Sequence, residues 1–348
     1  MPARLTGQFG DQELHLESDV ASRPHCRRVM AAVDDSHVSQ TAIPHAVAIA
    51  SALDADLTLV RVLEPKRKSA GPSDPVEWHI LREQAHCQIE ELARLQADNL
   101  GRIDTRVVEG RPADEICHWA RENQVDLTVL CTHGSGGAIE RDLGRTARRV
   151  IECASGPVLL VPASMEEPRQ VHYRRILVLL DGSSRAESAL PFALRLAQAE
   201  HAELIPVHAI PEPEFTEIGP PEPEDVALRA QLMRRNQRVA QDYLDRLRAH
   251  IESKGVPVRI LLLQGGDARH ALMNAFADQK PDLIVMASHG HSGHMDVAAG
   301  SVATYLISHA HVPLLLVRNL VSGSNGGARS ALVRYSADDA RLAARVAV

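Results

Sequence analysis

The sequence has few aromatic residues, no excess of positive charge and no long apolar run. Aromatic side chains make up 3% of the 348 residues, and the formal net charge is −7. Proteins that bind nucleic acid usually offer a basic surface for phosphates and aromatic rings for base stacking, so no nucleic-acid partner is expected. No stretch reaches the roughly 18 to 20 apolar residues of a membrane span, so no membrane partner is expected either.

Cysteine is scarce and confined to one half of the chain. None of the cysteines forms a C-x-x-C pair and the second half has none; the five are Cys26, Cys87, Cys117, Cys131 and Cys153. A disulfide framework common to both halves is therefore excluded, and a reducing cytoplasm fits best. The first residues also lack the apolar segment of a signal peptide, so we expect a cytoplasmic protein.

What the chain does contain is an internal repeat. RRVMAAVDDS near the start is matched later by RRILVLLDGS, which places Asp34 and Asp181 in equivalent positions. Further on, CTHG, nine residues and GR are matched by ASHG, nine residues and GS. Both segments then end in apolar runs, GPVLLVP and HVPLLLV. A repeat of this length predicts two copies of one domain, each with its own functional site.

Short apolar runs alternate with helical patterns in both copies. The runs are continuous, as in strands of a parallel sheet that are buried on both faces. We therefore expect an α/β protein with two tandem open parallel five-stranded sheets, Rossmann-like, with helices on both faces. The predicted strands lie near 28–33, 56–63, 103–109, 126–131 and 157–161, and near 174–180, 203–209, 257–263, 282–287 and 313–317. Predicted helices in the first copy lie at 38–53, 75–99, 113–123 and 145–154.

Polar and proline-rich segments set the domain boundaries. The proline- and acid-rich segment 210–225 is expected to be a loop, a solvated insertion being favoured over a lid. In the tail, Ser336, Asp338 and Asp339 are expected to cap a last short helix. The expected parts are a flexible extension at 1–24, domains at 25–164 and 173–319, and a flexible tail at 320–348.

The matched polar residues follow the predicted strands, where ligands bind in open α/β sheets. Asp34 and Asp181 follow the first strand of each copy, and a glycine-rich loop ends at Gly144 or Gly300, which opens a helix. A helix N-terminus attracts phosphate, and an aspartate accepts hydrogen bonds from ribose hydroxyls. Together these features describe a nucleotide cleft. Tight turns between strand and helix explain the same glycines about equally well.

Each copy resembles a universal stress protein domain, and the whole chain resembles the tandem type. The family's nucleotide motif is G-x-x-G, nine residues, then G followed by Ser or Thr. The second copy replaces only the first glycine, by Ala287, whereas the first copy has Cys131 there and Arg145 in place of the hydroxyl residue. The resemblance implies an adenine-nucleotide alpha-hydrolase-like fold. It also implies ATP or another adenine nucleotide as ligand, with Mg²⁺ as a candidate ion, bound better by the second copy.

The resemblance also implies which residues bind the nucleotide. In the second copy the adenine would face Leu179 and Ala209, the ribose Asp181, and the phosphates Gly290, Gly300 and Ser301, with Ala287, Ser288, His289 and Val302 in the same motif. The equivalents in the first copy are Ala32, Val62, Asp34, Gly134, Gly144 and Arg145. Arg145 either pairs with phosphate or closes the site by its bulk.

Other candidate groups have more ordinary explanations. His289, His291 and His294 have no carboxylate or cysteine beside them to complete a metal site, so polar loop residues are expected. Ser183 and Ser184 follow Asp181 where a helix begins, which favours N-capping. Cys131 is expected to be a small buried apolar residue, with redox sensing as the alternative.

Neither motif contains an identifiable base, a carboxylate pair for a metal or a lysine facing phosphate, so no catalytic residue and no enzyme are expected. The favoured function is a binding module that responds to stress through protein partners. A scaffold that binds no nucleotide, and a weak ATPase or self-phosphorylating protein, are the alternatives. Because the last strands would be hazardous if exposed, we expect them to pair in an intramolecular pseudo-dimer or a homodimer.

Overall fold

The computed structural model describes residues 26–65, 74–96, 100–134, 143–165, 170–210, 212, 223–288 and 300–318. We call residues 26–165 the first copy and residues 170–318 the second copy. The expectations for the extension at 1–24, the tail at 320–348 and most of the loop at 210–225 lie outside the described residues. The end of that expected loop is described, and it is already helical from Pro223. A proline fits the first position of a helix, and the negative charges of Glu224 and Asp225 stabilise the positive N-terminal end.

Ten strands form one sheet in the order β3-β2-β1-β4-β5-β10-β9-β6-β7-β8. β5 and β10 are antiparallel, and every other neighbouring pair is parallel. The expected pair of five-stranded sheets is thus a single sheet, and the last strands of the two copies pair inside the chain as predicted. The strands are β1 (Arg28–Val33), β2 (Asp56–Leu63), β3 (Ile103–Glu109), β4 (Leu127–Cys131), β5 (Val158–Val161), β6 (Arg175–Leu180), β7 (Glu203–Ile210), β8 (Leu261–Gln264), β9 (Leu283–Ala287) and β10 (Leu314–Val317).

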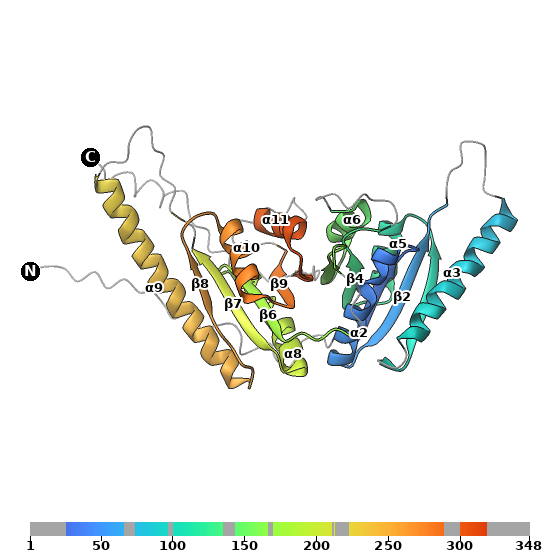
Figure 1. Ribbon diagram of the computed structural model, residues 1–348, viewed down its shortest axis with the longest axis horizontal. Coiled ribbons are helices and arrows are strands. Elements are labelled where there is room, and N and C mark those ends of the chain that lie inside the picture. Colours follow the sequence, from blue (N-terminus) through green and yellow to red (C-terminus); the bar gives the residue numbers. More distant parts are fainter. Residues whose placement is uncertain are drawn as a thin grey trace, which may run out of the picture.

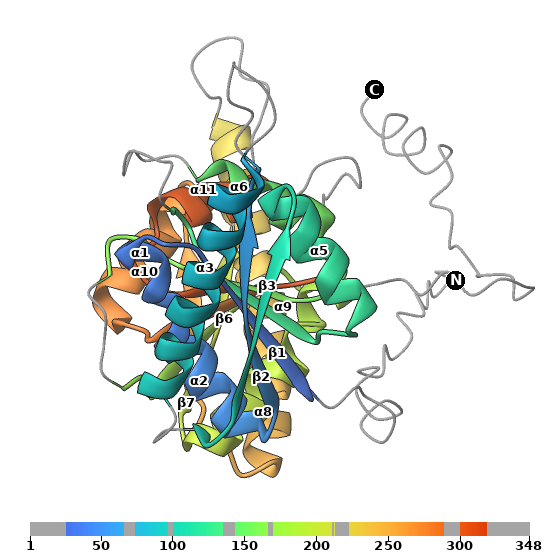
Figure 2. The same ribbon diagram turned by 90° about the vertical axis from the view of Figure 1, so that its right-hand side faces the viewer.

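Helices cover both faces of this sheet, and the long helices α3 and α9 lie at its two ends (Figures 1 and 2). Residues of α2, α3, α8 and α9 join one apolar core, and residues of α5, α6, α10 and α11 join the other. The helices are α1 (His37–Gln40), α2 (Ala42–Leu53), α3 (Pro75–Leu95), α5 (Pro112–Glu122), α6 (Arg145–Cys153), α7 (Ser184–Glu187), α8 (Leu190–Glu200), α9 (Pro223–Ser253), α10 (Ala268–Gln279) and α11 (Ser301–His309).

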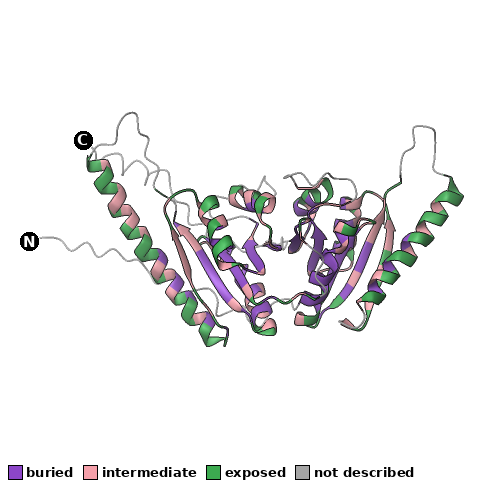
Figure 3. Ribbon diagram, viewed as in Figure 1, coloured by how far each residue is buried: buried purple, intermediate pink, exposed green. Residues whose placement is uncertain are grey.

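The joint between β5 and β10 is as buried as the centre of either copy (Figure 3). Leu159 and Leu315, opposite one another in the register, belong to one core, while Leu160 and Leu316 belong to the other. Burying a leucine side chain contributes roughly 1.5 to 3 kcal/mol. Pairing therefore removes two exposed edges and joins the cores of the copies.

Two predicted elements differ from the structure for local reasons. The helix expected at 38–53 is divided at Thr41 into α1 and α2, because Pro44 lacks an N–H and its ring clashes with the carbonyl one turn earlier. The strand expected at 257–263 begins with an isolated bridge at Val258 and becomes regular only in β8. β8 is an edge strand, so it is supported by a partner on one side only.

Candidate functional site

The strand order reverses between β1 and β4 in the first copy, and between β6 and β9 in the second. At each of these points an aspartate organises the turn after the first strand. Asp34 Oδ1 accepts a hydrogen bond from the Ser36 N–H (2.9 Å), and Asp181 Oδ1 accepts one from the Ser183 N–H (2.9 Å). Ser36 and Ser183 then cap α1 and α7. The expected N-cap is therefore Ser183, while Ser184 is the first helical residue.

The glycine-rich loop after the fourth strand is closed in the same way in both copies. The Gly144 N–H donates to the Thr132 carbonyl (3.0 Å), and the Gly300 N–H donates to the Ser288 carbonyl (3.0 Å). The equal spacing in the two motifs therefore brings the loop end back to the strand end. α6 and α11 begin immediately afterwards, and no side chain caps either one. Their first-turn amides consequently face the site with the positive end of the helix dipole.

The two glycines of the first-copy motif are enclosed more tightly than Gly300. A Cβ on Gly134 would overlap with the carboxylate of Asp34. A Cβ on Gly144 would lie 2.8 Å from the Thr132 carbonyl oxygen, which is closer than real Cβ contacts. At Gly300 the nearest atom among the described residues is the Ser288 carbonyl oxygen, 3.9 Å away. Space therefore requires glycine at position 144, where the obstacle is backbone, whereas at position 134 a Cβ would displace the Asp34 carboxylate. The close approach of Gly134 to Asp34 also shows that the ends of β1 and β4 meet.

A cavity of about 850 Å³ lies at this point of the first copy. It is bounded by the ends of β1, β2 and β4, the start of α6 and one side of α3. Its volume is within the usual range for small-molecule sites. All six residues that the sequence predicted for this copy line it: Ala32, Asp34, Val62, Gly134, Gly144 and Arg145.

Helix α3 supplies a wall of the cavity that sequence reasoning missed. Trp78 lines the cavity, and its indole N–H donates to Glu109 at the end of β3 (3.0 Å). Arg61 and Gln88, which are hydrogen-bonded to each other, line it as well. One of only two tryptophans in an aromatic-poor chain was the available signal for this wall. These side chains add both an aromatic surface and polar groups.

In the second copy the described site residues occupy the equivalent strand ends. His208, next to the predicted Ala209, donates its Nδ1 proton to the Leu180 carbonyl (2.9 Å) and lies edge-on to Tyr243 of α9. Burial raises the pKa of Tyr243, so its hydroxyl stays protonated. Leu179 and Ser288 are buried, Ala209, Ala287, Gly300 and Val302 are partly buried, and Asp181 and Ser301 are exposed. The predicted His289 and Gly290, together with His291 and His294, lie outside the described residues.

The remaining candidate groups do not make a further site. Cys131 is buried, and burial raises the pKa of its thiol, as expected for a small apolar residue. Within the described ranges, no cluster of three or more His, Cys, Asp or Glu side chains is arranged to hold a metal. No helix there combines the length and apolarity required to cross a membrane.

One covalent feature was not foreseen from the sequence: a disulfide joins Cys117 of α5 to Cys153 of α6. No disulfide framework can be common to both copies, as expected, since the second copy has no cysteine. The pairing was missed because the two residues are 36 positions apart and only the packing of α5 on α6 brings them together.

Comparison with known proteins agrees with this architecture. The model of the universal stress protein family matches residues 25–162 and 172–318. A universal stress protein of Mycolicibacterium smegmatis is 28% identical over 301 residues, which are 83% of this chain and 96% of the relative. One from Methanocaldococcus jannaschii is 30% identical over 145 residues, which are 40% of this chain and 85% of the relative. The crystal structure of a universal stress protein from Archaeoglobus fulgidus has the same fold, with a TM-score of 0.61 at 16% identity over 85% of this chain and 97% of that chain.

Proposed function

The chain belongs to the universal stress protein family as a tandem member, and on this premise we propose that it binds ATP or another adenine nucleotide. The observation that carries the proposal is the convergence of six predicted residues, from four separate segments of the first copy, on one cavity. A site assembled from four segments depends on the fold, whereas glycines that served only local turns need not face a common space. The second copy offers the same turn and the same loop closure.

The residues present fit such a ligand. Gly134 and Gly144 keep the cavity floor free of Cβ atoms, so a ligand can approach the backbone. The uncapped first turn of α6 presents N–H groups suited to phosphate. The apolar side chains of Ala32 and Val62 suit the faces of an adenine ring. The carboxylate of Asp34 is an acceptor for ribose hydroxyls.

We also propose that the second copy binds the nucleotide more tightly. Ser301 supplies a hydroxyl donor at the start of α11, where the first copy has the long side chain of Arg145. Among the described residues, Gly300 also has more room around it than Gly144. Mg²⁺ would accompany the phosphates as part of the ligand.

Titration calorimetry with ATP tests both proposals. Wild type should bind two equivalents, and Asp34→Ala and Asp181→Ala should each remove one of them. The tighter equivalent should be the one lost in Asp181→Ala. If wild type binds neither ATP, ADP nor AMP, the chain is a scaffold and the proposal is wrong.

The chain is proposed to act as a binding module, not as an enzyme, and to signal through protein partners during stress. Phosphate release measured with ATP should therefore stay at the background rate. Steady release that is abolished by Asp181→Ala would instead identify a weak ATPase. β5 and β10 already pair within the chain, so homodimerisation would need another surface. Light scattering gives the mass in solution and so shows whether two chains associate.

A further inference from the structure

The disulfide joins the two helices that border the phosphate end of the first-copy cavity. Pro112 and Ile116 of α5 line the cavity, as do Arg145 and Thr146 at the start of α6. Cys117 is the next residue after Ile116, and Cys153 is the last residue of α6. The bond therefore fixes α6 at the end opposite to its cavity-lining turn, roughly 12 Å away at 1.5 Å of rise per residue.

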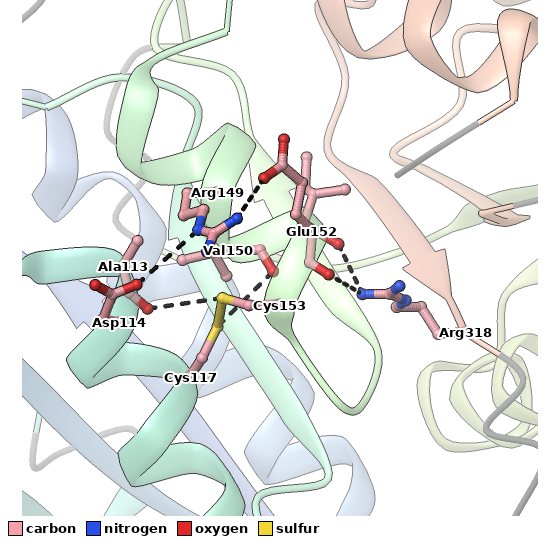
Figure 4. Close-up of polar contacts among 9 residues, drawn as sticks. Ala113, Asp114, Cys117, Arg149, Val150, Glu152, Cys153 and Arg318 are labelled. Atoms are coloured by element: carbon pink, nitrogen blue, oxygen red, sulfur yellow. Dashed lines mark hydrogen bonds and ion pairs between the residues drawn. A yellow bond between two sulfur atoms is a disulfide. The ribbon is translucent and has the colours of Figure 1, made fainter. Parts of the chain in front are cut away.

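A cation from the second copy holds the same end of α6 (Figure 4). The guanidinium of Arg318, the first residue after β10, donates to the carbonyls of Ile151 (2.7 Å), Glu152 (3.2 Å) and Ala154 (2.8 Å). These carbonyls surround Cys153 in the sequence and belong to the last turn of α6, where a cation is favourable. Burial lowers the pKa of Arg318, but an arginine remains charged.

A weaker contact joins α5 and α6 on the exposed side. Arg149 pairs with Asp114 of α5 (3.9 Å) and with Glu152 of its own helix (3.0 Å) (Figure 4). Exposed ion pairs contribute little. Opening the disulfide would therefore leave α6 held only by Arg318 and by the packing of its apolar face, so the helix could shift against α5.

From this arrangement we propose that Cys117 and Cys153 form a thiol–disulfide switch that sets the nucleotide affinity of the first copy. In the disulfide form α6 is fixed, so its first-turn amides are already positioned for phosphate. In the dithiol form a ligand must first order the helix, which weakens binding. The identity of the ligand in this inference depends on the proposed function. The motion of α6 does not depend on it.

The switch is confined to the first copy. Met273 stands at the position of Cys117, as far after the start of α10 as Cys117 is after the start of α5, and His309 ends α11 as Cys153 ends α6. Of the other cysteines, Cys26 and Cys131 are buried and Cys87 is exposed on α3. Cys117–Cys153 is the disulfide found among the described residues.

The reaction needs only a small disulfide as oxidant and a small thiol as reductant. Cys153 is partly exposed while Cys117 is buried, so the Cys153 thiolate attacks the oxidant RSSR, forms a mixed disulfide and releases RS⁻. The Cys117 thiolate then attacks Cys153 Sγ and expels the second RS⁻. Two protein thiols become one disulfide, RSSR becomes two RSH, and protons and electrons balance. Reduction follows the reverse path.

The experiment compares the full chain after equilibration with oxidised glutathione and after reduction with dithiothreitol. A Cys87→Ser, Asp181→Ala background removes the exposed thiol and silences the second-copy site. The oxidised protein should bind ATP about three- to tenfold more tightly than the reduced one, and hydrogen exchange in α6 should be slower. Adding Cys117→Ala and Cys153→Ala should abolish both differences.

Hydrogen exchange separates this inference from the proposed function. If neither form binds ATP but exchange in α6 still follows the redox state, the proposed function is wrong, and the redox-dependent motion of α6 stands without it. If the protein binds ATP with the same affinity in both redox states, the switch is overturned, and the same holds if exchange in α6 does not change with the redox state. If thiol counting shows that Cys117 and Cys153 stay reduced in the presence of oxidised glutathione, it is overturned as well.

Discussion

The two copies share a fold and differ in how the helix at the phosphate end is attached. In the first copy α6 is bonded to α5 through Cys117 and Cys153 and is held from outside by Arg318. In the second copy His309 stacks on Tyr305 within α11, with ring centroids 4.1 Å apart, and Arg269 of α10 lies 5.6 Å from the same ring. A covalent attachment responds to redox chemistry, and stacked rings do not. If the proposed nucleotide sites exist, redox chemistry can therefore reach the first one and not the second.

The contact between the copies near α2 and α8 is also asymmetric. His45 follows Pro44 in α2, where Phe192 follows Pro191 in α8. His45 Nδ1 lies 3.0 Å from the hydroxyl of Tyr173, a residue of the other copy, and both side chains are buried. Nε2 of this histidine has no hydrogen-bond partner among the described residues. At this contact the first copy therefore has a titratable side chain where the second copy has an apolar one.

The largest expected effect comes from removing the disulfide. Cys117→Ala with Cys153→Ala opens a loop of 36 residues and should lower the free energy of unfolding of the oxidised protein by about 3 to 4 kcal/mol. Urea unfolding followed by circular dichroism measures it. Cys87→Ala, at an exposed cysteine, is the matched control and should change stability by less than about 0.5 kcal/mol. Equal effects from the two variants would mean that the bond contributes nothing.

The second largest expected effect is a loss of stability in acid, which comes from His45 of the first copy. Burial lowers the pKa of His45 from 6.5 to about 4, so the unfolded chain binds a proton in this range and the folded chain does not. The contribution of neutral His45 is complete above pH 6.5 and is lost as the pH falls towards 4. It should amount to about 2 kcal/mol between pH 7 and pH 5.

Introducing the residue of the second copy tests this assignment. His45→Phe combined with Tyr173→Phe, which avoids leaving a buried hydroxyl without a partner, should remove that part of the acid sensitivity. Tyr173→Phe alone keeps the histidine and should retain it. Chemical denaturation at pH 7, 6 and 5 gives the slopes. An unchanged slope in the double variant would show that His45 does not titrate on unfolding.

The strands were predictable because their physical cause is local. The bounds of β1 agree with its apolar run, since a strand buried on both faces needs apolar residues throughout. The bounds of β2 and β3 were also predicted correctly, although β3 is an edge strand in which polar and partly buried residues alternate. The meeting of Asp34 and Gly134 followed from the rule for strand ends. The pairing of β5 with β10 was expected as well, although it makes one ten-stranded sheet where two sheets were predicted. What was missed is the disulfide between Cys117 and Cys153, which depends on a contact remote in sequence.

The wall formed by α3 was missed for a related reason. Trp78 belongs to a helix whose pattern predicts its existence but not its position over the ends of β1 and β2. The glycine motif, in contrast, is a local device. Its fixed spacing brings Gly144 back to Thr132, and that closure is repeated at Gly300 and Ser288. Local closure was therefore readable from the sequence, and the side wall of the site was not.

The next prediction compares Gly144 with Gly300, its equivalent in the second copy. Gly144→Ala would press a methyl group against the Thr132 carbonyl, and should cost about 1 to 2 kcal/mol of stability and displace the start of α6. Among the described residues, Gly300→Ala meets only an ordinary contact, so it should cost only the usual preference of an N-cap for glycine over alanine, about 0.5 to 1 kcal/mol, and less than Gly144→Ala. Thermal unfolding of both variants measures the difference. Equal losses would contradict the tighter enclosure of the first copy.

The smallest expected effect concerns Arg318, whose position after β10 is taken by Pro162 after β5. Arg318→Met keeps an apolar chain of similar length and removes the donors, so the α6 carbonyls must turn to water. Because that end of the helix is partly exposed, the loss should be about 1 kcal/mol. Arg318→Lys, which keeps the charge but not the fork of donors, should fall in between. In the oxidised protein the disulfide holds the same turn, so the loss should be smaller there than after reduction. Equal losses in both redox states, from unfolding curves with and without dithiothreitol, would show that the two attachments act independently.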